Sequence, residues 1–452
     1  MDKNNKKIFI GIDIGKDINW VSFLAEGKKE EVRKRFKINN DIYGFYKLLE
    51  ILEDYKVKDG IKESEFIIGI ESTGHYWQNL YDFFNKRKYD VVMVKNRIVK
   101  LKREAKYSQK GKNDSIDCHC IGLILKDDDY FEIKERDKNY ASLKRLARCK
   151  EDYTKSNTQN KNRLRAWIDV NNPVYLKVFS DVTSKTGIAI LREYPSPWDI
   201  VDKEIEEVKE KLQKDERNKG ILYRLVNEYL TLAKELYKDT IKINNGDREE
   251  IKIYLYQYEM LEYSIKDIDN TIRKLSEETI DSYDKIIKIK GVGNSEINLL
   301  LAEIGLVDNF INARALQSYF GLGIKGVGSG KEIKPPKITK AGSKRSRKLL
   351  YHMAMNLVSK NEDWRKVYCY YKSYNRNNPN TNKEMLVAVA CKFLRVIFGI
   401  LKHNVDFDTE ELFKGFDFKK CNKEKFISEY VGEKGKWNLT EEEINKLFEY
   451  KY

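Results

Sequence analysis

The N-terminal part of the chain has the hydrophobic pattern of a layered α/β domain. Residues 7–24, KIFIGIDIGKDINWVSFL, contain two β-rich runs joined around residues 15–17, which predicts a hairpin. Further strands are predicted over residues 31–38, 66–70 and 90–94, and helices near residues 43–55 and 77–86. Three strands, a helix and then strands alternating with helices indicate a mixed sheet covered by helices.

This order of elements matches an α/β ribonuclease-H-like core, which we expect to span residues 1–127. Residues 128–285 are highly charged and poor in Gly and Pro, which predicts helices. Within them, residues 202–281 are interrupted mainly at residues 244–246, so we expect two long helices that pair there as a hairpin or coiled coil. Strict heptads are not evident, and a solvated helical spacer and a dimerisation arm remain equal alternatives.

Residues 286–405 predict a second functional domain that is mainly α-helical. Its first segment, KIKGVGNSEINLLLAEIG, resembles a helix-hairpin-helix, in which the turn at residues 291–293 presents backbone N–H groups to a phosphate. A Gly-rich loop, a basic helix start and an apolar helix over residues 385–401 follow. Residues 406–452 mix acidic and aromatic residues and predict an appended helical tail.

Four acidic residues stand where the predicted core can bring them together. Asp13 projects from the strand FIGIDIG on the face opposite its apolar neighbours, and Glu71 ends the strand FIIGIE at the edge where α/β sites form. Asp114 and Asp117 lie one turn apart at the start of a predicted helix. Four such carboxylates can hold two divalent cations about 4 Å apart for phosphoryl transfer, and hard oxygen ligands favour Mg²⁺ or Mn²⁺. Taken alone, Asp114 and Asp117 also fit a helix cap and its first-turn acid.

The segment GLGIKGVGSG, residues 321–330, contains five glycines and places Ser329 between two of them. Glycines let the backbone approach a ligand closely, and an exposed serine beside a metal site can attack phosphate. A structural turn is the ordinary alternative for such a loop. Residues 331–348 contain eight basic residues against one acid, which would hold phosphates near Ser329.

The net charge of +15 suits a protein that meets a polyanion, although abundant Lys, Asn, Ile and Tyr also follow from an AT-rich genome. Local clusters are more informative. Residues 95–112 have eight basic residues against one acid, and residues 144–165 have eight against two with Asn and Gln interleaved, which favours a nucleic-acid backbone over a solvated face. The candidate nucleic-acid contacts are Lys100, Lys102, Arg103, Arg145, Arg148, Arg163, Arg165, Lys340, Lys344, Arg345 and Arg347.

Several classes of protein are excluded or disfavoured. The N-terminal residues pass directly into a strand, and no run of about 18 apolar residues occurs, so we expect neither a signal peptide nor a membrane span. We therefore expect a cytoplasmic protein that is associated with the nucleoid when it acts. The six cysteines lack paired CxxC spacing, and the Cys118-His119-Cys120 run has no second ligand pair, so neither a zinc site nor a disulfide framework is expected.

The motifs GIDIGKD, FIIGIESTG, KNDSID, IKGVG, LLAEIG, FGLGIKGVGSG and ITKAGSKRSRKLL, in this order, resemble the DEDD transposases of bacterial insertion sequences. These are relatives of the Piv DNA invertase and are described as bridge-RNA-guided recombinases. The resemblance implies a RuvC-like N-terminal domain and a C-terminal transposase domain. It also implies a metal-binding tetrad of Asp13, Glu71, Asp114 and Asp117, with Ser329 as the nucleophile that becomes linked to DNA.

The same resemblance implies a non-coding guide RNA that pairs with donor and target DNA, and a homo-oligomer, either a dimer or a tetramer. We therefore expect an RNA-guided recombinase that cuts and rejoins DNA through a covalent phosphoserine intermediate. No GxxxxGK[ST] motif is present, as expected where the phosphoserine bond conserves the energy for rejoining. One alternative is a RuvC-like structure-specific endonuclease that uses water as nucleophile. Another is a nucleic-acid binder without catalysis.

Overall fold

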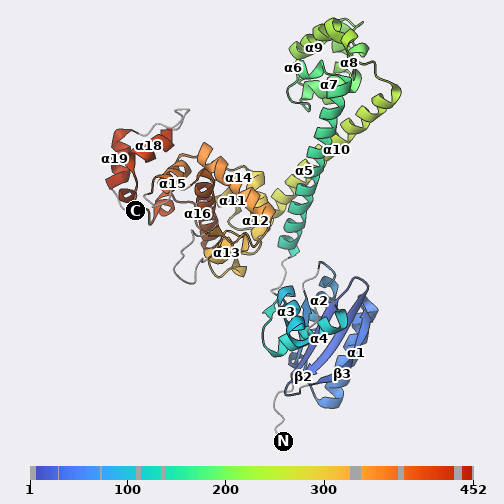
Figure 1. The fold of residues 1–452 in the computed structure, drawn as a ribbon, viewed down its shortest axis with the longest axis vertical. Helices are drawn as coiled ribbons and strands as arrows, with labels where there is room; N and C mark the ends of the chain where they lie inside the picture. Colours follow the sequence, from blue (N-terminus) through green and yellow to red (C-terminus); the bar gives the residue numbers. More distant parts are fainter. Residues whose placement is uncertain are drawn as a thin grey trace. The chain divides into compact units, whose positions relative to one another are not determined.

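The computed structural model describes residues 7–28, 30–71, 74–107, 113–133, 138–325, 337–374, 381–431 and 440–449. The chain divides into two compact units, Met1–Arg136 and Asp137–Tyr452. Figure 1 labels their helices and strands. Among the described residues, no helix combines the length and apolar character needed to cross a membrane.

The first unit contains a six-stranded mixed sheet in the order β3-β2-β1-β4-β5-β6. The strands are β1 Ile8–Ile14, β2 Ile18–Ala25, β3 Glu31–Asn39, β4 Phe66–Glu71, β5 Asp90–Val94 and β6 Phe131–Glu132. The pairs β1/β4 and β4/β5 are parallel, and the other three are antiparallel. The predicted hairpin and the predicted strands are confirmed, while the two-residue β6 is too short to leave a periodic signal in the sequence.

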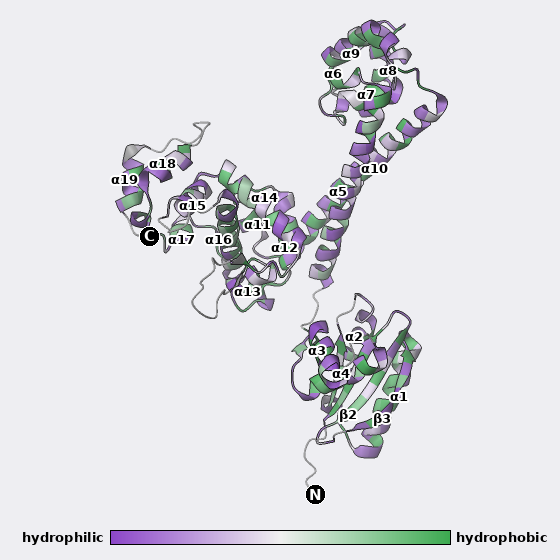
Figure 2. Ribbon diagram, viewed as in Figure 1, coloured by the Kyte–Doolittle hydropathy of each residue, from purple (hydrophilic) through white to green (hydrophobic). Residues whose placement is uncertain are grey.

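Helices cover both faces of this sheet, so the central strands β1 and β4 are buried along their whole length, whereas the edge strand β3 is charged and partly exposed (Figure 2). Helices α1 Ile42–Asp59 and α2 Gln78–Asn85 pack on one face, and α3 Asn96–Tyr107 and α4 Asp114–Lys126 pack on the other. Alternate residues of β1, from Ile8 to Ile14, enter the core beneath α1 and α2, whereas Phe9 enters the core beneath α4. The period of two therefore turns Asp13 toward α4.

Helix α4 lies very close to β1, because glycines meet where the two elements cross. A Cβ atom on Gly11 would lie 2.0 Å from the carbonyl oxygen of Cys118 and 2.4 Å from the backbone nitrogen of Gly122. Both are backbone atoms of α4, which cannot give way without moving the helix. Gly11 thus sets the height of α4 above the sheet, and with it the position of the first turn of α4 relative to Asp13.

The second unit is helical and includes a pair of long helices, α5 Lys138–Asn171 and α10 Asn245–Thr279 (Figure 1). The expectation that two long helices pair within residues 202–281 is wrong. In that range only α10 is long, and its partner α5 precedes the range. The residues between them form the shorter helices α6 Tyr175–Val178, α7 Lys185–Glu193, α8 Ile205–Gln213 and α9 Tyr223–Leu236.

Polar residues occupy much of the seam between α5 and α10. The buried positions Leu143, Lys150, Asn157 and Leu164 of α5 recur every seven residues. Lys150 Nζ contacts Asp269 of α10, and Asn157 Nδ2 donates to Glu262 Oε1 at 2.5 Å. Asn160 Nδ2 donates to the carbonyl oxygen of Tyr254 at 2.8 Å. These two buried asparagines therefore bind α10, and the interpretation that they favour a nucleic-acid backbone is wrong for them.

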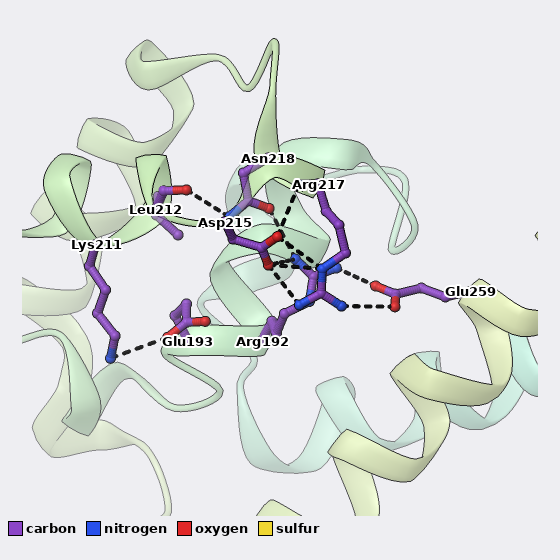
Figure 3. Close-up of polar contacts among 8 residues, drawn as sticks. All are labelled: Arg192, Glu193, Lys211, Leu212, Asp215, Arg217, Asn218 and Glu259. Atoms are coloured by element: carbon purple, nitrogen blue, oxygen red, sulfur yellow. Dashed lines mark hydrogen bonds and ion pairs between the residues drawn. The ribbon is translucent and has the colours of Figure 1, made fainter.

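Ion pairs attach the short helices that lie between α5 and α10 in the chain to α10 itself (Figure 3). Arg192 of α7 and Arg217, which follows α8, both point toward Asp215 and Glu259. Arg192 Nη1 lies 3.2 Å from Asp215 Oδ2, and Arg217 Nη1 lies 3.2 Å from Glu259 Oε2. Beneath them, an apolar core joins α5 to α10 through the shorter helices. Because Glu259 belongs to α10, the short helices are held on α10 by ion pairs as well as by the burial of apolar side chains.

The remaining helices share one core. They are α11 Tyr283–Ile287, α12 Asn294–Ile304, α13 Ala313–Tyr319, α14 Lys344–Lys360, α15 Glu362–Ser373, α16 Asn382–His403, α17 Thr409–Phe413, α18 Lys423–Val431 and α19 Glu441–Glu449. A short antiparallel pair, β7 Ile324–Lys325 and β8 Lys337–Ile338, stands between α13 and α14. The expected helices of residues 406–452 are present, but Phe418 and Phe426 lie in the same core as Trp364, so these helices pack as part of the domain and not as an appended tail.

Candidate metal centre

The strands bring two of the four predicted carboxylates to one edge of the sheet. Ile12 of β1 and Ile70 of β4 are partners in the parallel register, and Asp13 and Glu71 each follow directly. Parallel strands that end together place consecutive residues at the same edge. Both carboxylates are buried, with 3% of Asp13 and 9% of Glu71 exposed.

The first turn of α4 supplies the other two carboxylates. Asn113 caps this helix, since its Oδ1 accepts a hydrogen bond from the backbone nitrogen of Ile116 at 3.3 Å. Asp114 is therefore not the capping residue, contrary to the alternative that the sequence left open. Asp114 is exposed, whereas only 1% of Asp117 is exposed.

The approach of α4 to β1 gathers three of these side chains. Asp13, Asp114 and Asp117 each offer a carboxylate oxygen within 4.8 Å of the others. This group does not include Glu71, which ends the neighbouring strand. At an effective dielectric constant of about 20, unit charges that lie within 4.8 Å of one another, as in this group, repel by about 3 kcal/mol or more for each pair. An arrangement of this kind is stabilised by cations.

Arg103 provides one positive charge at this site. Its Nη1 lies 2.5 Å from both Oδ1 and Oδ2 of Asp117. Arg103 is 7% exposed, so it lies inside the domain rather than on an exposed basic surface. This placement differs from the expectation that Arg103 contacts nucleic acid, because its guanidinium is engaged by a buried carboxylate.

A second group of polar side chains fixes the first turn of α4 to strand β3. Arg35 Nη1 donates to the carbonyl oxygen of Ser115 at 3.1 Å, and Arg35 Nε donates to Glu31 Oε1 at 2.7 Å. His119 Nδ1 lies 2.8 Å from the same Glu31 oxygen. Burial opposes the ionisation of Glu31, but hydrogen bonds from Arg35 and Ser22 outweigh it and lower the pKa of this carboxyl. This group was not predicted from the sequence.

The Cys118-His119-Cys120 run has structural partners of its own. Burial lowers the pKa of His119, which favours the neutral imidazole. Burial raises the pKa of Cys118, and burial and the nearby Asp117 raise that of Cys120 to about 11, so both thiols stay protonated at neutral pH. Cys118 Sγ contacts the carbonyl oxygen of Ser115 at 3.2 Å. These contacts account for the three side chains as part of the packing of α4.

The strands on either side of the segment that contains Ser329 pair with each other. Ile324 pairs with Ile338, and Lys325 pairs with Lys337, so β7 and β8 bring the two ends of the segment together. Ser329 itself lies outside the described residues, as do the basic residues nearest to it. After β8 the chain continues into α14, whose first turn carries three of the predicted nucleic-acid contacts, Lys344, Arg345 and Arg347.

The other predicted nucleic-acid contacts occupy several surfaces. Lys100 of α3, Lys340, and Arg145, Arg148, Arg163 and Arg165 of α5 are exposed. Some have partners within the chain. Lys102 contacts Asp127, Arg165 pairs with Asp169, and Arg345 Nη2 lies 3.2 Å from Asp152 of α5. Arg347 Nη1 donates to the carbonyl oxygen of Gly342 at 2.8 Å.

The predicted helix-hairpin-helix segment forms α11, a turn and α12. Gly291 has φ of +106°, a conformation that favours glycine, and Gly293 caps α12. The backbone N–H of Gly293 donates to Glu296 Oε2 at 3.2 Å. That amide is therefore engaged within its own helix, and a role of the turn in phosphate binding stays a prediction.

Two family models match the chain. A transposase model for DEDD transposases of the IS110 type matches residues 10–173, from β1 into the region just after α5. A second model, described as the Transposase IS116/IS110/IS902 family, matches residues 283–369, from α11 into α15. No curated protein sequence gives a significant match.

The first match contains all four predicted acidic ligands, and the second contains the serine loop and the first turn of α14. Together the two matches cover more than half of the chain and occur in the order that the motifs predict. An acidic cluster in a DEDD domain indicates the use of divalent metal ions. The chain belongs to the IS110-type DEDD transposases, enzymes that cut and rejoin DNA.

Proposed function

We propose that the chain is the RNA-guided recombinase of an insertion sequence, and that it cuts and rejoins donor and target DNA through a covalent phosphoserine intermediate. The observation that carries this proposal is the convergence of Asp13, Asp114 and Asp117, whose oxygens lie within 4.8 Å of one another. Glu71, at the end of the adjacent strand, is the proposed fourth acidic ligand. A guide RNA supplies the sequence recognition, and the protein supplies the chemistry.

The residues at this site fit Mg²⁺ or Mn²⁺. The cluster offers only carboxylate oxygens, which are hard ligands, and no thiolate or imidazole takes part in it. Asp13 and Asp117 would hold the ions from the buried side, and the exposed Asp114 would hold them on the side open to substrate. Bound divalent ions would stabilise negative charge on the phosphate that is attacked.

Ser329 is the proposed nucleophile. Its Oγ would form a bond to a DNA phosphorus atom as one P–O bond of the phosphodiester breaks, and the released DNA hydroxyl takes up a proton. One phosphoester bond replaces another, so a second DNA hydroxyl can reverse the exchange without ATP. The order of elements supports this role, because β8, which follows the serine loop in the chain and pairs with β7, comes a few residues before the basic first turn of α14.

The first turn of α14 supports phosphate binding near that loop. It contains Lys344, Arg345 and Arg347 and no acidic residue. Positive side chains at a helix N-terminus oppose the helix dipole, so their presence there does not serve the stability of the helix. Backbone N–H groups and cations at one helix start together favour a phosphate. The exposed arginines of α5 are the second proposed nucleic-acid surface.

RNA guidance predicts that the purified chain joins donor to target DNA with Mg²⁺ only when RNA transcribed from beside its gene is added. Changing the target-pairing segment of that RNA should redirect joining to the matching DNA, since base pairing reads the sequence. The products are followed by sequencing of the junctions. The same RNA should be retained at low salt and lost between about 50 and about 200 mM salt.

Two outcomes would contradict this proposal in different ways. Joining that proceeds equally well without RNA would mean that the protein itself reads the DNA. Release of nicked DNA without joined products would favour the structure-specific endonuclease, in which water is the nucleophile.

The proposed homo-oligomer has a candidate interface on α10. Ile253, Tyr256, Met260 and Tyr263 are each at least 46% exposed. Their spacing of three, four and three residues places them on one face of the helix, turned away from the buried positions that meet α5. A stripe of this kind, rich in tyrosine, is typical of a helical interface.

Replacing both Tyr256 and Tyr263 by Asp should weaken self-association on the order of a hundredfold, because it places two charges in an apolar interface. Analytical ultracentrifugation over a range of concentrations measures the effect. Lys266→Asp, on an exposed part of α10 outside the stripe, is the matched control and should associate like the parent. Unchanged association of the double variant would exclude this face as the interface.

A further inference from the structure

Helix α3 turns one of its basic residues inward. Arg97, Lys100 and Lys106 of this helix are exposed and Lys102 is partly exposed, whereas only 7% of Arg103 is exposed. Arg103 lies four residues after Val99, which is also buried, so both are on the face that packs against the domain. The burial of Arg103 therefore follows from the packing of α3.

The contact between Arg103 and Asp117 has the geometry of a bound cation. A single nitrogen, Nη1, lies 2.5 Å from both carboxylate oxygens, which is the place that a cation held by both oxygens would take. Only 1% of Asp117 is exposed, so water screens this pair weakly. An arginine side chain also cannot lose its charge by deprotonation.

We propose that Arg103 is a permanent counter-cation of the metal centre, which competes with divalent ions for Asp117. This inference rests on the proposed metal site. Without metal, the guanidinium offsets repulsion among the three clustered aspartates. When a divalent ion binds, the guanidinium has two alternatives. It gives up its contact with one Asp117 oxygen, or it stays close to the positive charge of the ion. Each alternative costs free energy and therefore lowers the affinity for the ion.

The rival role for Arg103 is to orient Asp117 as a ligand, and the two roles have opposite signs. Hydrogen bonds that orient a ligand raise metal affinity, so removal of an orienting residue weakens binding. A nearby positive charge opposes a cation, so its removal strengthens binding. The direction of the change in affinity therefore separates the two roles.

Titration of the full-length protein with Mn²⁺, followed by electron paramagnetic resonance, tests the proposal. Arg103→Gln retains an N–H donor but removes the charge, and it should bind the most weakly held Mn²⁺ on the order of tenfold more tightly than the parent. Arg103→Lys retains the charge and should stay close to the parent. Arg97→Gln makes the same charge change at an exposed position of α3 and should leave the affinity unchanged.

Thermal unfolding provides a readout that does not depend on spectroscopy of the ion. In EDTA, Arg103→Gln should unfold at a lower temperature than the parent, because the aspartates lose their counter-charge. Mg²⁺ should stabilise this variant more than the parent, since tighter binding to the folded state gives greater stabilisation.

Equal or weaker Mn²⁺ binding by Arg103→Gln would overturn the proposal and leave Arg103 as an orienting residue. If Arg103→Gln does not fold, a marked gain or loss of Mn²⁺ affinity in Arg103→Lys would overturn it, because the charge is retained there. Asp13→Asn distinguishes failure of the metal site itself. If the parent and Asp13→Asn bind Mn²⁺ identically, the ions are held elsewhere and the proposed function loses its metal centre.

Discussion

Replacing Asp117 or Asp13 by Asn is expected to lower Mg²⁺-dependent DNA strand cleavage by about a thousandfold or more, while nucleic-acid binding survives. Each substitution removes one ligand charge from a group whose oxygens lie within 4.8 Å, and it alters no residue of the exposed basic surfaces. Cleavage of labelled DNA under single-turnover conditions measures the rate, and a gel-shift assay measures binding.

Asp129→Asn is the matched control for this experiment. Asp129 is exposed and follows α4 at the end opposite to Asp114 and Asp117, so the same change of charge there should leave cleavage at the parental rate. If either Asp13→Asn or Asp117→Asn cleaved DNA as fast as the parent, the assignment of the acidic tetrad would be wrong.

Ser329→Ala is expected to abolish the denaturation-resistant protein–DNA complex and the recombinant product, with folding and nucleic-acid binding unchanged. Alanine keeps the backbone and removes only the attacking oxygen. Gel migration of labelled DNA in detergent after reaction with Mg²⁺ detects the complex, and protease digestion establishes that protein is attached. Ser329→Cys is expected to retain at most a trace of complex, because a thiolate is a poorer partner for a hard ion.

Ser359→Ala, at an exposed serine of α14, is the control and should form the complex normally. Recombination by Ser329→Ala at the parental rate would reject the serine mechanism. Water would then be the remaining nucleophile, as in the endonuclease alternative.

The sheet was predictable from the sequence because its signal is local. Alternate residues of β1 enter opposite cores, and the period of two is visible in the order of residues alone. The same period placed Asp13 on the face opposite Ile12 and Ile14, and the start of α4 placed Asp114 and Asp117 together. Three of the four predicted acidic ligands could therefore be brought together from spacing.

The partner of α10 was not predictable in this way. A coiled coil is recognised by apolar residues every three or four positions, but Lys150 and Asn157 occupy two successive seam positions of α5. Their partners, Asp269 and Glu262, are more than a hundred residues away in the chain. In the sequence of one helix alone, a polar interface of this kind has the same pattern as a solvated surface.

The inward position of Arg103 had a weak signal in the sequence. It follows Val99 by four residues, so both share one face of α3, but eight basic residues in the same stretch conceal this spacing. The contact of Arg35 with Ser115 had no local signal, since Ser115 is eighty positions away in the chain.

The close crossing of α4 over β1 also determines which substitutions the domain can tolerate. Gly11 carries no group that reacts or binds an ion, yet a methyl group there would overlap backbone atoms of α4. Asp13 is fixed to the strand and Asp117 to the helix, so any lift of the helix separates their oxygens directly. A residue without a side chain is therefore under as strict a constraint as the acids, because it acts as the spacer that sets the distance between them.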